Sequence, residues 1–237
     1  MRIAEVFKRP RAFLPVVHPV TREHALAAVD VAVAAGADGV FLIDQGLGER
    51  DVLALVGEVY GRHPTLWIGL NLLSRAPADA LATALEANNR IDGIWSDNAR
   101  VDERVAEQER AQEFVDARRR LGWQGLYFGG VAFKYQREVA RADLGRTTAL
   151  AGGYMDVVCT SGAGTGHAAD PAKPRAMREG APGVALALAS GVTTANVGEY
   201  LPYVDAYLVG TGIERELGVL DPDETKRLAT AIHAFTA

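Results

Sequence analysis

Three apolar segments dominate residues 155–213, and each ends in small polar residues: MDVVCTSG at residues 155–162, GVALALASG at residues 183–191 and DAYLVGTGI at residues 205–213. The segments are almost continuously apolar, as is typical of parallel strands that are covered on both faces. Each is followed by a stretch with the apolar spacing of a helix. This part of the chain therefore predicts consecutive strand–helix units.

The same pattern extends back to the N-terminus. Five earlier segments have this character: residues 13–19 (FLPVVHP), 39–44 (GVFLID), 65–72 (TLWIGLNL), 93–98 (GIWSDN) and 125–133 (GLYFGGVAF). Eight strands, each followed by a helix, within 237 residues predict a (β/α)8 TIM barrel, whose usual length is about 250 residues. A doubly wound open sheet is the alternative, but it rarely needs eight regular units. Because no linker or low-complexity tract divides the chain, we expect residues 1–237 to form one domain.

Three of the helices have clear boundaries. Residues 25–35 are rich in Ala and Val and end at Gly36, a residue suited to a C-cap. Residues 104–121 carry many charges and stop before a glycine. At Asp221 a capping Asp is followed by Pro and, three positions on, Glu, which predicts a helix up to about Phe235.

Composition narrows the class of protein. With 25 Lys and Arg against 30 Asp and Glu, the net charge of −5 provides no basic field for nucleic acid. A single cysteine, Cys159, excludes a disulfide framework and a Cys-rich zinc site. The first residues, MRIAEVFKRPRAF, lack the apolar core of a signal peptide, and no run of 18 residues is apolar enough to span a bilayer. We expect a cytoplasmic protein without a transmembrane segment.

In a TIM barrel the functional site lies at the carboxyl ends of the strands, where the following loops converge. Polar residues occupy these positions after every predicted strand. They are His18, Asp44, Gln45, Asn71, Asp97, Asn98, Lys134, Thr160, Ser161, Thr165, Ser190 and Thr211.

The last three loops contain glycines and hydroxyl residues. Glycine lets main-chain N–H groups approach an oxyanion, hydroxyls add donors, and helix N-termini attract negative charge. TIM barrels commonly bind a phosphate at the loops after strands seven and eight. The alternative is that these glycines only form tight turns. We predict a phosphate or other anion site made of Ser161, Gly162, Gly164, Thr165, Ser190, Gly191, Gly210 and Thr211, with Asn71 as a further substrate contact.

Four residues are candidates for catalysis. Asp44 and Asp97 provide carboxylates for proton transfer or for Mg²⁺, or else they cap helices and pair with cations. Lys134 could pair with a substrate anion, act as a base or form a Schiff base. His18 could act as a base, a hydrogen-bond partner or a metal ligand, or be an ordinary buried histidine. The pattern predicts no specific metal ligand set and no cofactor, with Mg²⁺ left open.

The C-terminal third resembles the BtpA family. The residues that carry the resemblance are the run DVVCTSGAGTG at residues 156–166, Asp170, the run ASGV at residues 189–192, Asn196-Val197 and Val209-Gly210-Thr211. Weaker matches are Val17-His18-Pro19, Gly69-Leu70-Asn71 and Phe133-Lys134, which resemble the family's histidine, asparagine and lysine after strands one, three and five. The resemblance implies a barrel of the ribulose-phosphate-binding type.

This sequence departs from the family pattern in two places. A Pro-Leu-Pro-Gly loop is expected after the first histidine, but Pro19-Val20-Thr21 leads directly into the helix. Glu-Asn is expected after strand two, but the chain has Asp44-Gln45. The anion-binding end of the site is therefore expected to be retained, while the substrate end is expected to differ.

Several functions fit these observations. The main hypothesis is an enzyme that isomerises, cleaves or hydrolyses a small phosphorylated metabolite such as a sugar phosphate or nucleotide. The family is named for a role in photosystem I biogenesis, so a non-catalytic assembly factor is the alternative. A Mg²⁺-dependent hydrolase that uses His18 and the aspartates is a further one. Homo-oligomerisation is left open, because no surface in the sequence marks an interface.

Overall fold

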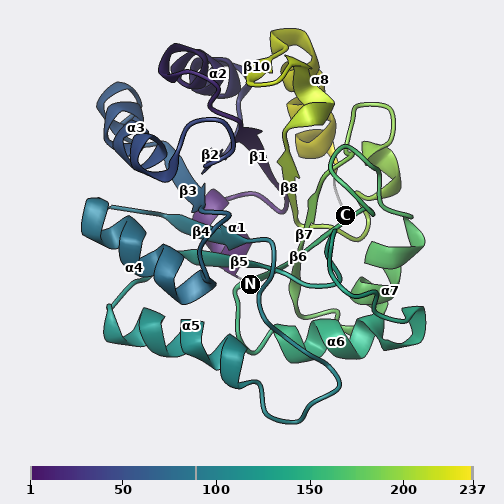
Figure 1. Cartoon of the computed structure of the whole chain (residues 1–237). Helices are drawn as coiled ribbons and strands as arrows, with labels where there is room; N and C mark the ends of the chain where they lie inside the picture. The colour runs from purple at the N-terminus through teal and green to yellow at the C-terminus, as the bar shows by residue number, and fades with distance from the viewer. Residues whose placement is uncertain (1, 89, 236–237) are drawn as a thin grey trace.

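The computed structural model describes residues 2–88 and 90–235 and contains a closed barrel of eight parallel strands (Figure 1). Neighbouring strands pair in chain order, and β8 pairs with β1 to close the sheet. The predicted TIM barrel is therefore confirmed. The strands are β1 (Ala12–Val17), β2 (Gly39–Ile43), β3 (Trp67–Asn71), β4 (Gly93–Ser96), β5 (Leu126–Gly130), β6 (Val157–Ser161), β7 (Ala185–Ala189) and β8 (Ala206–Val209).

Eight α-helices are present in the described residues: α1 (Arg2–Phe7), α2 (Arg22–Ala35), α3 (Glu49–Arg62), α4 (Pro77–Ala87), α5 (Glu109–Arg120), α6 (Leu144–Ala151), α7 (Ala172–Gly180) and α8 (Pro222–Ala234). One of them, α1, precedes the first strand. The connection after β7 holds only the short 3-10 helix η2 (Val197–Glu199), so the full helix expected there is absent. The side chain of Asn196 explains the compact connection, since it accepts from Thr193 N–H and donates to Gly191 O.

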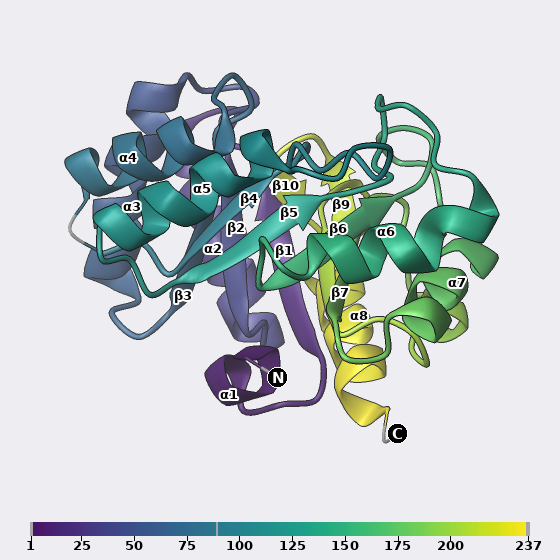
Figure 2. The same cartoon turned by 90° about the horizontal axis from the view of Figure 1, so that it is seen from below.

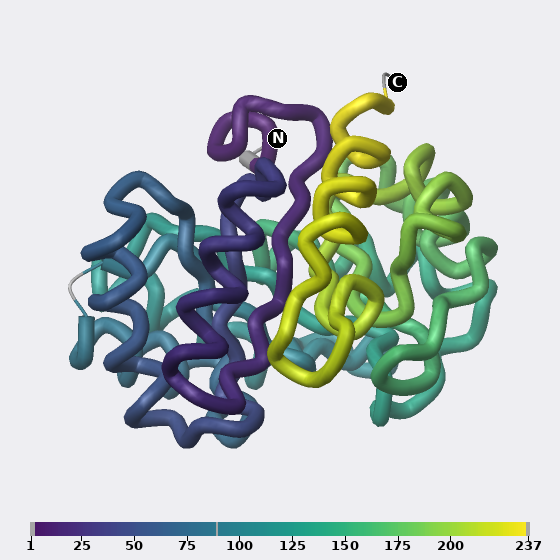
Figure 3. Tube along the Cα trace, turned by 90° about the horizontal axis from the view of Figure 1, so that it is seen from above, coloured from purple at the N-terminus to yellow at the C-terminus, as the bar shows by residue number. Residues whose placement is uncertain are grey.

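The predicted helix boundaries are confirmed at two places. Gly36 ends α2 in the left-handed conformation, with φ of 84°. Asp221 caps α8 by accepting from the N–H groups of Asp223 and Glu224. α8 then packs beside α2 on the outside of β1, which brings the C-terminal helix next to the N-terminal part of the barrel (Figure 3).

The prediction for residues 104–121 was wrong at its N-terminal end, because α5 begins only at Glu109. The preceding residues form a loop that the Gln108 side chain organises. Its carboxamide accepts from Asp102 N–H and donates to the carbonyl oxygens of Asp102 and Val105. These bonds take the place of the first helical turn.

Two hydrophobic layers position the strands. One lies inside the barrel, where Phe41, Trp67 and Trp95 pack edge to face, and the other lies between the sheet and the helices. Gly69 leaves room for the ring of Phe41, which a Cβ at that position would meet at 2.2 Å. Helix α1 covers the end of the barrel where the strands begin, so loops at the opposite end are the accessible ones (Figure 2).

No helix in the described ranges combines the length and apolar character that a bilayer span requires.

Candidate functional site

The predicted site residues follow the strands at one end of the barrel, which we call the barrel mouth. His18, Asp44 and Asp97 come directly after β1, β2 and β4. Asn71 and Ser161 are the last residues of β3 and β6, while Lys134 lies on the loop after β5. Because all eight strands are parallel, these side chains approach the mouth from neighbouring positions. Their contacts form three groups, and Asp44 belongs to none of them.

The first group is a network across β3, β4, β5 and the loop after β6. Asn71 Nδ2 donates to Asp97 Oδ1 at 3.0 Å, and Lys134 Nζ lies 3.8 Å from Asp97 Oδ2. Lys134 Nζ also donates to Thr165 Oγ1 at 3.2 Å. The structure thus joins two residues predicted for catalysis with two predicted for substrate binding.

Burial changes the acidity of Asp97. Loss of water around its carboxyl raises the pKa, while the charge of Lys134 and the hydrogen bond from Asn71 act in the opposite direction. The burial effect prevails, so Asp97 holds a proton more readily than an exposed aspartate. This property is useful in a group that gives and takes protons.

The loop after β5 holds Lys134 in place through unusual backbone conformations. Ala132 and Tyr135 have φ of 48° and 61°, a left-handed region that non-glycine residues rarely adopt. Tyr135 is exposed, and its hydroxyl accepts from Thr165 N–H at 3.3 Å. Such strain is maintained only by surrounding contacts and is common at functional sites.

Ser161 supports this loop through its hydroxyl group. Its side chain is fully buried, and its hydroxyl accepts from Lys134 N–H at 2.8 Å and donates to Gly162 O. The structure therefore gives Ser161 the geometry of a support for Lys134, whereas Thr165 presents its hydroxyl at the network.

The glycine-rich loops form the second group. Ser190 and Gly191 both have left-handed backbone, with φ of 74° and 68°. A Cβ on Gly191 would lie 2.3 Å from main-chain atoms of residues 167–168, so the loops after β6 and β7 touch at this glycine. A Cβ on Gly162 would lie 2.1 Å from His167 O, a close approach within the loop after β6. In the described part of the chain, no hydrogen bond takes up the N–H groups of Gly191, Thr211 or Gly212.

The third group pairs His18 with a residue that sequence reasoning missed. His18 Nδ1 lies 2.8 Å from Glu214 Oε1, and both side chains are buried. Glu214 also accepts from Gly218 N–H, within the hairpin of β9 (Glu214–Glu216) and β10 (Val219–Leu220). The imidazole lies against Gly210, whose Cβ would be 2.5 Å from His18 Cε1. No sequence signal marked Glu214, because it follows the last predicted strand in a charged run.

Asp44 lies apart from the network. Its Oδ1 accepts from Leu73 N–H at 2.7 Å, which ties the loop after β2 to the loop after β3. Within the described residues, no hydrogen bond or ion pair joins Asp44 to Asp97, and no group of three His, Cys, Asp or Glu side chains is placed to hold a metal ion. Cys159 is fully buried in β6, and burial raises the pKa of its thiol well above the ordinary value.

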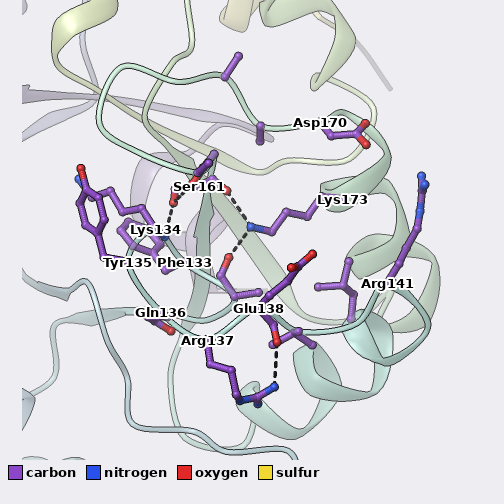
Figure 4. A pocket seen from close by; sticks show the side chains of 17 residues that line it. Phe133, Lys134, Tyr135, Gln136, Arg137, Glu138, Arg141, Ser161, Asp170 and Lys173 are labelled. Atoms are coloured by element: carbon purple, nitrogen blue, oxygen red, sulfur yellow. Dashed lines mark hydrogen bonds between the residues drawn. The ribbon is translucent and has the colours of Figure 1, made fainter.

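A cavity of about 580 Å³ lies beside the network, between the loops after β5 and β6 (Figure 4). Lys134, Tyr135, Ser161 and Gly162 line it on the side of the mouth. Lys173, at the start of α7, lines it on the outer side. Sequence reasoning also missed Lys173, since it lies in the first turn of a helix and not directly after a strand.

Comparisons with known proteins agree with this fold. The sequence model of the BtpA family matches residues 51–234. No curated protein sequence matches the chain. Among solved structures, (S)-3-O-geranylgeranylglyceryl phosphate synthase from Thermoplasma acidophilum, in complex with its substrate sn-glycerol-1-phosphate, is 13% identical with a TM-score of 0.68, over 99% of this chain and 98% of that one.

Two further structures are similar over nearly the whole barrel. Tryptophan synthase from Mycobacterium tuberculosis is 17% identical with a TM-score of 0.68, over 99% of both chains. Phosphoribosyl anthranilate isomerase from Thermus thermophilus is 15% identical with a TM-score of 0.62, over 92% of this chain and 96% of that one. Identities this low establish the barrel fold alone.

Proposed function

This chain belongs to the BtpA family, and from that membership and the geometry of the barrel mouth we propose that it is an enzyme acting on a small phosphorylated metabolite, such as a sugar phosphate or a nucleotide. The observation that carries the proposal is the position of Lys134 Nζ, which contacts Thr165 of the glycine-rich loop and lies 3.8 Å from Asp97. One ammonium group thereby connects an anion-binding loop to a carboxyl that can transfer a proton.

The phosphate would bind at the loops after β6, β7 and β8. The open N–H groups of Gly191, Thr211 and Gly212 and the hydroxyls of Thr165 and Ser190 are the donors that such a ligand requires. Two similar barrels have phosphorylated compounds in their descriptions, the glycerol phosphate complex and the phosphoribosyl anthranilate isomerase. Both support an anion at this end of the barrel.

The reacting part of the substrate would lie over Asp97 and Lys134. Asp97 would accept a proton from a carbon beside a carbonyl group and return it to the neighbouring atom, and the ammonium of Lys134 would stabilise the negative charge that develops on the carbonyl oxygen. His18, held by Glu214 through Nδ1, keeps Nε2 for a second proton transfer near Gly210. Aldose–ketose isomerisation and aldol cleavage are the reactions that use these groups.

Binding can be tested without knowing the substrate. A ligand that binds the folded state raises the melting temperature by mass action. We expect inorganic phosphate, glycerol phosphates, sugar phosphates or nucleotides to raise it, measured with and without Mg²⁺. Ser190→Asp places a carboxylate at the anion site. Ser190→Asn introduces a side chain of the same size as aspartate but without its charge. Asp and Asn both tolerate the left-handed conformation of position 190.

We expect the shift to disappear in Ser190→Asp and to remain in Ser190→Asn. Equal shifts in both variants would place the anion elsewhere and remove this part of the proposal.

Catalysis is tested separately by proton exchange. In D₂O, an enzyme of this kind exchanges the hydrogen beside the carbonyl of its substrate for deuterium, which proton NMR detects. For compounds that raise the melting temperature, we expect exchange with the wild type and a loss of at least about 100-fold in Asp97→Asn, the usual size of a general acid–base contribution. Binding without exchange by the wild type would favour a non-catalytic ligand-binding protein.

A further inference from the structure

Lys173 holds two loops together from inside the outer cavity. Its Nζ donates to Ser161 O at 2.8 Å and also to Ala132 O. Figure 4 shows the side chain reaching between the two carbonyl groups, on the opposite side of Ser161 from Lys134. An ammonium group has three N–H donors, and in the described residues the third one has no acceptor.

The charge of Lys173 lacks a close counter-ion. In the part of the chain that the structure describes, no carboxylate lies within ion-pair distance of its Nζ, and burial lowers the pKa of the amine. A cation that has lost water and has no paired anion is costly, so a folded chain normally neutralises or pairs it. Here the group borders an open cavity of about 580 Å³, a volume within the range of metabolite sites.

The other charged groups around the cavity are engaged or face outwards. Asp170 accepts from Ala172 N–H at the start of α7, and Arg137 pairs with Glu103. Glu138 is exposed to water and favours the charged form of Lys173 only from a distance. Lys134 also lines the cavity, but its ammonium contacts Asp97 and Thr165, and Arg141 is exposed to water. Among the described residues, Lys173 is therefore the partly buried cation of the cavity that has no paired carboxylate.

The remaining walls are largely apolar. Side chains of Ala132, Val139, Leu144, Ala163 and Ala168 line the space between the two loops. Lys134 and Arg137 are already paired with carboxylates, so a ligand inside the cavity would meet Lys173 as its unpaired cation. A single such partner suits a carboxylate that carries an apolar body better than a doubly charged phosphate. We propose that the cavity is a second binding site, beside the barrel mouth and on the side of Ser161 that faces Lys173, for a small organic acid whose carboxylate pairs with Lys173 and whose hydrocarbon part packs on these walls.

Occupancy of this site would act on the barrel mouth. Ser161 accepts from Lys134 N–H, and its carbonyl accepts from Lys173, so a ligand that draws the amine of Lys173 towards itself loosens the bond that supports Lys134. The site is thereby suited to an effector as well as to a separate substrate. Its existence does not depend on the phosphate proposal.

Butyrate and benzoate are suitable probes, with butanol and benzyl alcohol as uncharged analogues. Calorimetric titration of the full chain is expected to show that both acids bind and that the alcohols bind at least about tenfold more weakly, since a charge-assisted hydrogen bond contributes about 1.5–3 kcal/mol. Lys173→Met is expected to weaken benzoate binding by a similar factor. Glu138→Gln is expected to strengthen it, because a repelling charge is removed.

Two controls keep the test decisive. Lys173→Met removes a tie between two loops, so Ala163→Phe, which fills the cavity from an exposed position and keeps Lys173, provides an independent block and is also expected to abolish binding. Ser190→Asp is expected to leave benzoate binding unchanged, because that position belongs to the barrel mouth. Equal binding of acids and alcohols, weaker binding in Glu138→Gln, or loss of binding in Ser190→Asp would each overturn the second site.

Discussion

At the scale of single residues, Asp97 makes stability depend on pH. Its pKa is raised in the fold, chiefly by burial, so the folded state binds the proton more tightly than the unfolded state. The resulting stabilisation of the folded state is complete below the ordinary pKa of about 3.9 and is lost as the pH rises through the raised pKa. The asparagine of Asp97→Asn cannot titrate. The free energy of unfolding of this variant, relative to that of the wild type, should therefore increase between about pH 3 and pH 7.

Urea unfolding of both proteins across this pH range measures the difference, in which the titration of all other groups cancels. A difference that stays constant with pH, or that moves in favour of the wild type, would contradict the raised pKa.

The buried pair of His18 and Glu214 gives a second prediction. Glu214 accepts the proton on Nδ1 of the imidazole, so the neutral ring should be the tautomer with a free Nε2. Nitrogen NMR of labelled histidine identifies the tautomer directly. Glu214→Ala leaves Nδ1 and Gly218 N–H without their acceptor, which should cost about 1–3 kcal/mol of stability and yield a mixture of tautomers. An unchanged tautomer would show that another group orients the ring.

At the scale of elements, two glycines that look alike in the sequence should respond in opposite ways to alanine. A Cβ on Gly162 would lie 2.1 Å from His167 O, so Gly162→Ala forces apart two segments of the loop after β6 and should cost about 1–3 kcal/mol. Gly57 lies inside α3 with no atom near its Cβ position, and Gly57→Ala should stabilise the chain by about 0.5–1 kcal/mol. Denaturant unfolding measures both changes, and two effects of the same sign would refute the assignment.

Individual helices and strands differ in how well the sequence predicts them. Local chemistry was sufficient where a cap or an apolar run decides the structure, as at Gly36, Asp221 and the eight strands. It was insufficient at α5, where the Gln108 side chain replaces a helical turn. Glu214 and Lys173 were missed for a related reason. Their roles come from contacts over long sequence distances, with His18 in one case and Ala132 in the other.

The candidate site was also predictable only in part from the sequence. Position after a strand was enough to select Asn71, Asp97, Lys134 and Thr165, which the structure joins in one network. The same rule could not separate Ser161, whose hydroxyl is used inside the protein. Periodicity indicates which residues reach the mouth, but the direction of each side chain depends on the loops packed around it.

At the scale of the whole molecule, the two ends of the barrel differ in structure. The mouth carries strained loops, open N–H groups and a carboxyl with a raised pKa. The opposite end is closed by α1, where Ile3 and Phe7 join the inner core and the Phe7 ring packs edge to face on Trp67 with 5.2 Å between ring centres. Stability and ligand binding should therefore respond to different mutations.

Phe7→Ala tests this division. Removing a buried phenylalanine side chain should cost about 3–5 kcal/mol, because a cavity opens beside Trp67. Val6, the exposed neighbour on the same helix, is the matched control, and Val6→Ala should change stability by less than about 0.5 kcal/mol. Because α1 lies at the opposite end from the mouth, the ligand affinity of folded Phe7→Ala should equal that of the wild type. A loss of affinity in proportion to the loss of stability would mean that the inner core transmits strain along the barrel, and that the two ends act as one unit.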